Sequence, residues 1–134
     1  FIPVIIGMGG NIGTQSSTTI VRGMATGRIE LGNEWKILMK ELKVGLILGM
    51  LYGFLLGMFA ILKFVDTDPM IGFVVGLSIF ASMLLATGVG AFSPLILRKL
   101  DIDPAVATGP FVTTSIDILG VLLYFIIASL LLTF

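Results

Sequence analysis

The last hydrophobic stretch of the chain, residues 103–134, has the sequence DPAVATGPFVTTSIDILGVLLYFIIASLLLTF. After Asp103 its only charged side chain is Asp117, which has thirteen uncharged residues before it and seventeen after it. A run of this length and composition predicts a membrane-spanning helix, with the carboxylate near its middle. A charge at that depth costs about 2.5–3.5 kcal/mol on insertion scales, and such residues usually mark an ion or proton pathway. Asp117 is therefore the first candidate for a functional residue.

The composition of the whole chain indicates a helical membrane protein. Of the 134 residues, 57% are hydrophobic and only 12% are charged, whereas about 25% are charged in a soluble domain. Four apolar stretches fill most of the length, at 1–21, 44–62, 70–97 and 103–134. They lack the alternation of a membrane β-barrel. We therefore predict an all-α membrane protein with four transmembrane helices in a single domain, residues 1–134.

Residue types that are missing restrict the chemistry. The chain has no Cys and no His, and its formal net charge is zero. Any bound metal must therefore be a hard cation held through oxygen atoms. The neutral charge gives no reason to expect a nucleic-acid partner. We predict no cofactor and no enzymatic activity, because an intramembrane aspartyl protease would need two Asp residues within the spans and only Asp117 is present.

Residues 22–43, between the first two spans, are predicted to form a loop that ends in an amphipathic helix at the membrane surface. Asn33 is a candidate N-cap of this helix, and Trp35 would lie at the level of the lipid headgroups. Its apolar side, at helical spacing, consists of Leu31, Trp35, Leu38 and Leu42.

Basic residues predict the orientation. The 22–43 and 98–103 loops hold seven of the eight Lys and Arg residues, and the turn between the second and third spans holds only Lys63. Because cytoplasmic loops are enriched in Lys and Arg, these two loops are predicted to be cytoplasmic and the C-terminus to lie outside. The chain begins at Phe1 rather than at Met, so we expect an upstream part to precede it.

The second and third spans are predicted to pack closely through glycine. Gly45, Gly49, Gly53 and Gly57 recur every four residues in the second span, and small residues at that period let another helix approach. In the third span Pro94 is expected to kink the helix near its end. The corresponding glycines there are Gly72, Gly76, Gly88 and Gly90.

The first span contains a run of small and polar residues, GGNIGTQSSTT at 9–19. These groups cannot all face hydrocarbon, so they line a cavity or pack against other helices. Asn11 and Gln15 are four residues apart and share a helix face. In the last span, spacings of three and four residues place Thr113, Asp117, Gly120 and Tyr124 on one face.

Two of these motifs resemble the MgtE family of magnesium transporters. The run GGNIGTQS at 9–16, followed by VRG at 21–23, is similar to that family's second membrane helix. The run DPA at 103–105, with GP at 109–110 and TTSIDILG at 113–120, is similar to its fifth helix. The resemblance covers nearly the whole chain, which would hold four of the family's five membrane helices.

The resemblance implies a homodimeric helical bundle in the cell (inner) membrane. It implies a cation path at the dimer axis, with Asp117 as the ion-selecting carboxylate and Mg²⁺ as the transported ion. Mn²⁺ and Co²⁺ stay open as alternatives, because they also accept oxygen ligands. It further implies a first helix and cytosolic regulatory domains that are absent from these 134 residues. The residues expected to line the path are Gly10, Asn11, Gln15, Gly109, Thr113 and Gly120.

Two other functions remain open from the residues alone. The chain would be a non-transporting membrane anchor or dimerisation domain if Asp117 were a protonated group hydrogen-bonded to a neighbouring helix. It would be a different, cation-coupled secondary transporter if the carboxylate exchanged Na⁺ or H⁺. Polar residues of the first and last spans facing one shared cavity favour transport, whereas separate contacts with protein favour the anchor.

Overall fold

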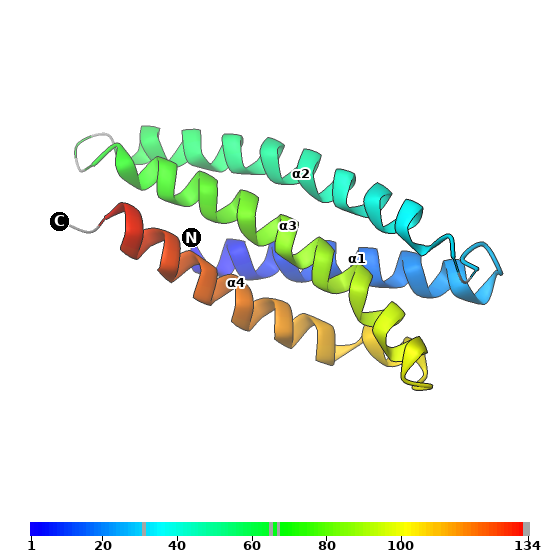
Figure 1. Cartoon of the computed structure of the whole chain (residues 1–134). Helices are drawn as coiled ribbons and strands as arrows, with labels where there is room; N and C mark the ends of the chain where they lie inside the picture. Colours follow the sequence, from blue (N-terminus) through cyan, green and yellow to red (C-terminus); the bar gives the residue numbers. More distant parts are fainter. Residues whose placement is uncertain (31, 65, 67, 133–134) are drawn as a thin grey trace.

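The computed structural model describes residues 1–30, 32–64, 66 and 68–132, and every regular element in that part of the chain is helical. Each predicted span contains one long helix, and Figure 1 shows the four running alongside one another. Both termini lie toward the side of the α2–α3 turn, and the other two connections lie at the opposite end. The elements are α1 (Ile2–Ala25), α2 (Glu34–Lys63), α3 (Met70–Lys99), the 3₁₀-helix η1 (Pro104–Thr108) and α4 (Pro110–Leu131).

The lengths and exposed surfaces of the helices are those of an all-α membrane domain. Helices α2, α3 and α4 are each long and apolar enough to cross a membrane. The 22 residues of α4 extend about 33 Å, slightly more than a hydrocarbon core of about 30 Å. Large apolar side chains lie on the outside, such as Phe54, Leu62 and Leu130, which are 67%, 70% and 74% exposed. The 24-residue α1 is long enough to cross, but its polar run lowers its hydropathy.

Helices α2 and α3 form a hairpin whose backbones touch through glycine. A Cβ atom on Gly53 would lie 2.7 Å from the carbonyl oxygen of Gly76, and one on Gly57 would lie 2.9 Å from that of Gly72. Real Cβ atoms do not approach backbone that closely, so any side chain at these positions would force the helices apart. The close packing predicted for Gly53, Gly57, Gly72 and Gly76 is therefore confirmed, whereas a Cβ atom on Gly88 would meet only the Leu42 Cδ2, at 3.9 Å.

Helix α3 lies at the centre of the bundle and contacts α1, α2 and α4. Helices α1 and α3 approach each other as closely as α2 and α3 do, because a Cβ on Gly90 would collide with the backbone carbonyl of Gly13. Ile116 of α4 fills the space beside Gly13. The main apolar core forms where the helices converge and includes Ile5, Ile12, Ile79, Met83 and Ile116.

The predicted surface helix is the beginning of α2 and continues into the second span without a break. Asn33 is the N-cap residue, although its side chain makes no capping hydrogen bond. Leu38 is buried in a second apolar cluster with Ile20, Ile29, Ala91 and Leu95. Trp35 is 68% exposed and packs edge to face on Phe92, with 6.4 Å between ring centroids. Leu31, predicted to belong to the same apolar side, lies outside the described residues.

The connection from α3 to α4 corrects the predicted start of the last span. Asp103 and Pro104 begin η1 instead of the long helix, and the Asp103 side chain accepts a hydrogen bond from the Ala105 N–H at 3.0 Å. Gly109 is extended, with φ −106° and ψ −157°, and α4 starts at Pro110. The physical reason is that a residue before proline is driven out of the helical region. A single helix therefore cannot run from residue 103 to the C-terminal end.

Candidate functional site

Asp117 lies on the seam between α4 and α1. Its side chain is half-buried, and a Cβ atom built on Gly10 would lie 3.6 Å from its Oδ1. The carboxylate therefore rests beside the α1 backbone, with no side chain of Gly10 between them. Because α4 begins at Pro110, Asp117 lies about one turn before the midpoint of the helix. The charge is still deep within the span.

The carboxylate has no protein partner within the part of the chain that the structure describes. No described side chain donates a hydrogen bond to it, and no Lys or Arg nitrogen lies within the 4.0 Å of an ion pair. A carboxylate in a membrane span is normally paired or hydrogen-bonded, because an unpaired charge there is costly. Among the described residues, Asp117 is therefore a half-buried carboxyl group with no such partner.

Small and hydroxyl-bearing residues share helix faces with Gly10 on α1 and with Asp117 on α4. On α1, spacings of three and four residues place Gly7, Gly10, Thr14 and Thr18 on one face. The Thr14 hydroxyl donates to the Gly10 carbonyl at 2.8 Å. On α4, the hydroxyl of Thr113, one turn before Asp117, donates to the Pro110 carbonyl at 3.1 Å. Both hydroxyl hydrogens are bonded within their own helices, so their oxygen atoms remain available as acceptors.

Three members of this face were missed by the sequence prediction, namely Gly7, Thr14 and Thr18. The signal that identifies them is the helical spacing from Gly10, which selects one face of the polar run. A Cβ atom on Gly7 would meet nothing within 4 Å, so this part of the face is open in the single chain.

The two amides predicted to line the path lie on a different side of α1. Asn11 follows Gly10 by one residue and Gln15 by five, so they point about 100° and 140° away from it. Both are exposed, and they line a shallow hollow with Met8, Ile12, Leu48, Tyr52 and Met83. The structure therefore does not bring Asn11 and Gln15 to Asp117 within one chain. Their grouping with Asp117 came from the family resemblance.

The two glycines of the predicted lining have separate positions. Gly120 is buried against α3, and a Cβ atom there would lie 2.9 Å from the Ser82 Oγ. Its small size permits helix packing, and it contributes no exposed surface to the seam. Gly109 is half-buried and is the N-cap of α4. Its carbonyl accepts the Val112 N–H at 3.2 Å, so it is used in starting the helix.

One buried hydrogen bond positions the segment that precedes α4. The Ser17 hydroxyl of α1 donates to the Ala107 carbonyl of η1 at 2.8 Å, and both residues have no exposed surface. Irregular backbone at membrane depth is tolerated only where protein or a water-filled cavity satisfies it. Part of the polar run of α1 therefore holds η1, and through it the start of α4.

We expect Ser17→Ala to destabilise the domain, because the Ala107 carbonyl would be left buried without a partner. The loss of such a partner costs about 1–3 kcal/mol. The matched control is Ser115→Ala, since the Ser115 hydroxyl bonds only to the Phe111 carbonyl of its own helix at 2.8 Å. Thermal unfolding in detergent should show a lower midpoint for Ser17→Ala than for Ser115→Ala. Equal midpoints would contradict a positioning role for Ser17.

The aspartates of the turns stabilise the starts and ends of neighbouring helices. The Asp68 carboxylate accepts the Met70 N–H at 2.8 Å at the start of α3, and Asp103 caps η1 as described above. Asp101 has a φ of 56° and is followed by the Ile102 N–H bond to the Leu97 carbonyl at 2.9 Å, an arrangement that ends helices. These contacts give the three residues structural roles in the turns.

No group of three or more His, Cys, Asp or Glu residues that could hold a metal ion occurs in residues 1–30, 32–64, 66 and 68–132. Asp117 is thus a single carboxylate on a polar seam. A hydrated cation could be attracted there, but one chain does not supply a complete ligand shell.

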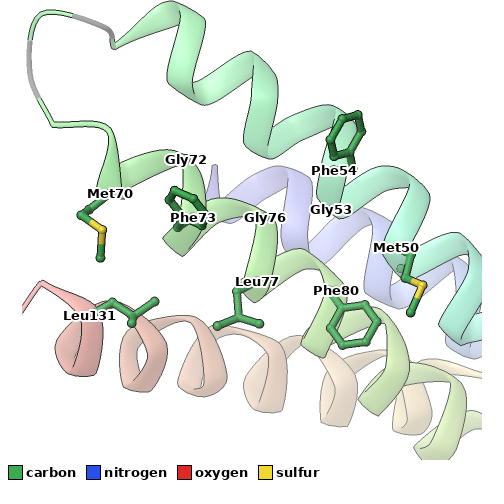
Figure 2. Close-up of a pocket in the computed structure, with 11 residues that line it drawn as sticks. Met50, Gly53, Phe54, Met70, Gly72, Phe73, Gly76, Leu77, Phe80 and Leu131 are labelled. Atoms are coloured by element: carbon green, nitrogen blue, oxygen red, sulfur yellow. The ribbon is translucent and has the colours of Figure 1, made fainter.

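A separate groove of about 650 Å³ lies on the other side of the bundle, between α2, α3 and the end of α4 (Figure 2). It has no charged or polar side chain in its lining. Such a surface suits hydrocarbon and gives a cation nothing to bind. The residues labelled in Figure 2 include Phe54, Phe73, Phe80, Met50, Met70 and Leu131.

Comparison with known proteins gives one consistent result. The family described as "MgtE: Divalent cation transporter" matches residues 2–127. Magnesium transporter MgtE of Thermus thermophilus is 40% identical over 132 residues, which are 98% of this chain and 29% of that protein. The Bacillus subtilis protein of the same name is 35% identical over 96% of this chain and 28% of its own length. The Enterococcus faecalis protein of that name is 36% identical over 97% of this chain and 28% of its own length. The chain thus spans less than a third of these relatives.

Proposed function

Because the chain belongs to the MgtE family of divalent cation transporters, we propose that it forms part of a membrane protein that transports Mg²⁺. The observation that carries the proposal is the half-buried carboxylate of Asp117 within α4. It has no partner among the described residues and lies on a seam of small and hydroxyl-bearing residues. The relatives named as magnesium transporters support Mg²⁺ as the ion.

The chemistry of Mg²⁺ suits a site with few protein ligands. The ion is reluctant to lose its water and is usually bound through one or two carboxylates, with several waters retained. Asp117 would attract the ion by charge, and the oxygen atoms of Thr14 and Thr113 would accept hydrogen bonds from its waters. The ion is the transported substrate, and no resident cofactor is proposed.

We propose that a second copy of the chain completes the path. One chain offers one carboxylate on an open seam, so a two-fold axis beside this seam would bring two Asp117 side chains to the same path. A pair of carboxylates of this kind is a known device for selecting cations. The seam residues Gly7, Gly10 and Thr14 would form the other wall. In this proposal Gly109 and Gly120 support the wall through the start and the packing of α4, and Asn11 and Gln15 lie away from the carboxylate.

The distribution of basic residues supports an inner-membrane orientation. The end where α1 meets α2 and where α3 stops contains seven of the eight Lys and Arg residues. We place this end in the cytoplasm and the C-terminal end of α4 outside. An ion entering from outside would then pass the Tyr124 level of α4 before it reaches Asp117.

Magnesium flux is the direct test of this function. The full-length protein would be reconstituted into liposomes that contain a Mg²⁺-sensitive dye, and an outward-to-inward Mg²⁺ gradient would be imposed. We expect dye signal above that of protein-free liposomes. A membrane anchor would give no such signal, and a coupled secondary transporter would give flux only with an imposed Na⁺ or H⁺ gradient. The first result would overturn the proposal, and the second would show that Mg²⁺ transport is coupled to another ion.

A single introduced cysteine tests the proposed path, since the chain contains no Cys of its own. We expect a Cys in place of Thr113 to react with a water-soluble thiosulfonate and to be cross-linked between two copies by a short bifunctional one. Ile126→Cys is the control, because Ile126 is 55% exposed and lies about 180° around α4 from Asp117. Equal reactivity of the two variants, or cross-linking only at Ile126, would place the shared axis elsewhere.

A further inference from the structure

A basic hollow lies at the end of the bundle where α1 connects to α2, and neither Gly10 nor Asp117 belongs to its lining. Its volume is about 460 Å³, within the range of about 300–1,000 Å³ that is usual for small-molecule sites. Three of its lining residues are basic and one is acidic, so their net charge is +2. The polar residues of the lining are Thr19, Arg22, Thr26, Arg28, Lys40 and Glu41.

The hollow has a defined shape because the turn after α1 is packed in place. Ile29 is 3% exposed and fits against Gly23, where a Cβ atom would lie 2.6 Å from the Ile29 Cδ1. The Ile29 N–H donates to the Gly23 carbonyl at 3.1 Å. The guanidinium of Arg98, at the end of α3, donates to the Ile29 carbonyl at 3.2 Å. The Arg28 side chain is therefore attached to a fixed backbone, next to Arg22 and Lys40.

The basic side chains of the hollow have no counter-ion within the described residues. No carboxylate there lies within 4.0 Å of Arg22, Arg28 or Lys40. The hydroxyl hydrogens of the two threonines are already donated, from Thr19 to the Gln15 carbonyl at 2.9 Å and from Thr26 to the Arg22 carbonyl at 2.9 Å. A ligand would therefore be held by cationic groups, which indicates an anion with several acceptor oxygen atoms.

The position of the hollow relative to the membrane identifies the source of this anion. Arg22 directly follows the uncharged residues 1–21, and Lys40 lies about one turn before the uncharged residues 44–62. The hollow is thus at the boundary between hydrocarbon and water. Ile29 and Ile37 give it an apolar wall. Basic hollows between membrane helices at this level suit the headgroups of anionic lipids.

We propose that this hollow binds the phosphate headgroup of an anionic phospholipid, with Arg22, Arg28 and Lys40 around the phosphate. The orientation proposed above places this headgroup in the cytoplasmic leaflet, so that assignment rests on the proposed function. Binding of the headgroup does not depend on the transported ion. The proposal therefore fails or stands independently of magnesium transport.

The test compares two pairs of substitutions that remove the same charge. The test pair is Arg22→Gln with Arg28→Gln. The control pair is Lys36→Gln with Lys43→Gln, because both lysines are exposed at the same end of the bundle and lie outside the hollow. Full-length protein in neutral detergent would be titrated with phosphatidylglycerol and, in parallel, with phosphatidylcholine. Native mass spectrometry would give the dissociation constant of the first bound lipid, and helicity would confirm that each variant is folded.

We expect the original protein to prefer phosphatidylglycerol. The test pair should weaken that binding about 25-fold, since each basic residue near an anionic lipid surface contributes about fivefold. The control pair should retain most of the affinity. Arg22→Lys with Arg28→Lys keeps the charge and should bind at an intermediate level. Glycerol 3-phosphate, added in excess, should not displace the lipid.

Three outcomes would overturn the proposal. Equal losses of phosphatidylglycerol affinity in the test and control pairs would show that the lipid is attracted to the whole basic end of the bundle and is not bound in the hollow. Displacement by glycerol 3-phosphate at low concentration would assign the hollow to a soluble phosphate compound. If phosphatidylglycerol bound no better than phosphatidylcholine, the hollow would not be a site for anionic lipid. Its basic side chains would then be assigned to contact with an acidic protein surface.

Discussion

Replacing Gly90 with alanine should prevent α1 and α3 from packing and should leave little folded protein. A Cβ atom at this position would collide with the Gly13 carbonyl oxygen and would also lie 2.8 and 2.9 Å from the Gly13 carbonyl carbon and Cα. Backbone atoms cannot rotate away as a side chain can, so the whole of α1 would have to move. Overpacking costs about 1–3 kcal/mol even when side chains adjust. We therefore expect the upper end of that range.

Gly88→Ala is the control, because it changes the same residue type two positions away in the same helix. A Cβ atom there would meet only the Leu42 Cδ2, at 3.9 Å, which is ordinary contact. Alanine also favours helix over glycine by about 1 kcal/mol. The thermal midpoint in detergent should therefore be at least that of the original protein for Gly88→Ala and well below it for Gly90→Ala. Only Gly88→Ala should keep the original size-exclusion profile. Equal stability of the two variants would contradict the α1–α3 crossing.

The consequence of this crossing extends to the proposed ion path. Gly13 is three residues from Gly10 on α1, and Ile116 of α4, which packs beside Gly13, precedes Asp117. A displaced α1 would therefore move the Gly10 backbone away from the carboxylate. Loss of transport in Gly90→Ala would be a consequence of misfolding, which is why the variant tests the fold and not the selectivity.

Hydrophobic runs and glycine spacing were sufficient to predict the arrangement of most helices. The long apolar segments between charged turns predicted four helices, and the four-residue period of Gly53 and Gly57 predicted close approach of another helix, which is α3. Glycine alone did not distinguish a packed position from an open one, however. Gly88 and Gly90 look equivalent in the sequence, and only the crossing of α1 separates them.

The limits of the sequence prediction were local and had physical causes. Helix α4 starts later than the apolar run predicts, because Pro110 holds Gly109 outside the helical region. The polar run of α1 was expected to line a cavity or to pack against other helices, and its residues divide among three surroundings. Gly10 lies beside Asp117, Ser17 holds η1, and Asn11 lies in another hollow. That division depends on which neighbouring helix faces each residue, and helical spacing alone cannot supply it.

Removing the charge of Asp117 should have the largest effect on transport. Asn has nearly the same size as Asp and retains hydrogen-bonding groups, so Asp117→Asn should fold and assemble. What it removes is the attraction between the carboxylate and the cation. Two unit charges 4 Å apart interact by about 4 kcal/mol at an effective dielectric constant of about 20. Half of that interaction already corresponds to about 30-fold in rate or affinity.

Asp117→Glu distinguishes charge from geometry. It keeps the carboxylate but moves it outward by one methylene, so part of the transport should remain, with altered preference among divalent cations. If Asp117→Glu were as inactive as Asp117→Asn, the position of the carboxylate rather than its charge would be limiting. Asp101→Asn is the matched control for loss of one negative charge, since Asp101 is exposed in the α3–α4 turn and Asn tolerates its positive φ.

The initial rate of Mg²⁺ entry into liposomes that contain equal amounts of folded Asp117→Asn or Asp101→Asn protein tests the central claim most directly. The account predicts a rate at least about 30-fold below the original for Asp117→Asn, from the charge interaction above, and an unchanged rate for Asp101→Asn. A folded Asp117→Asn protein that transports Mg²⁺ at the original rate would contradict the claim that this carboxylate attracts the ion.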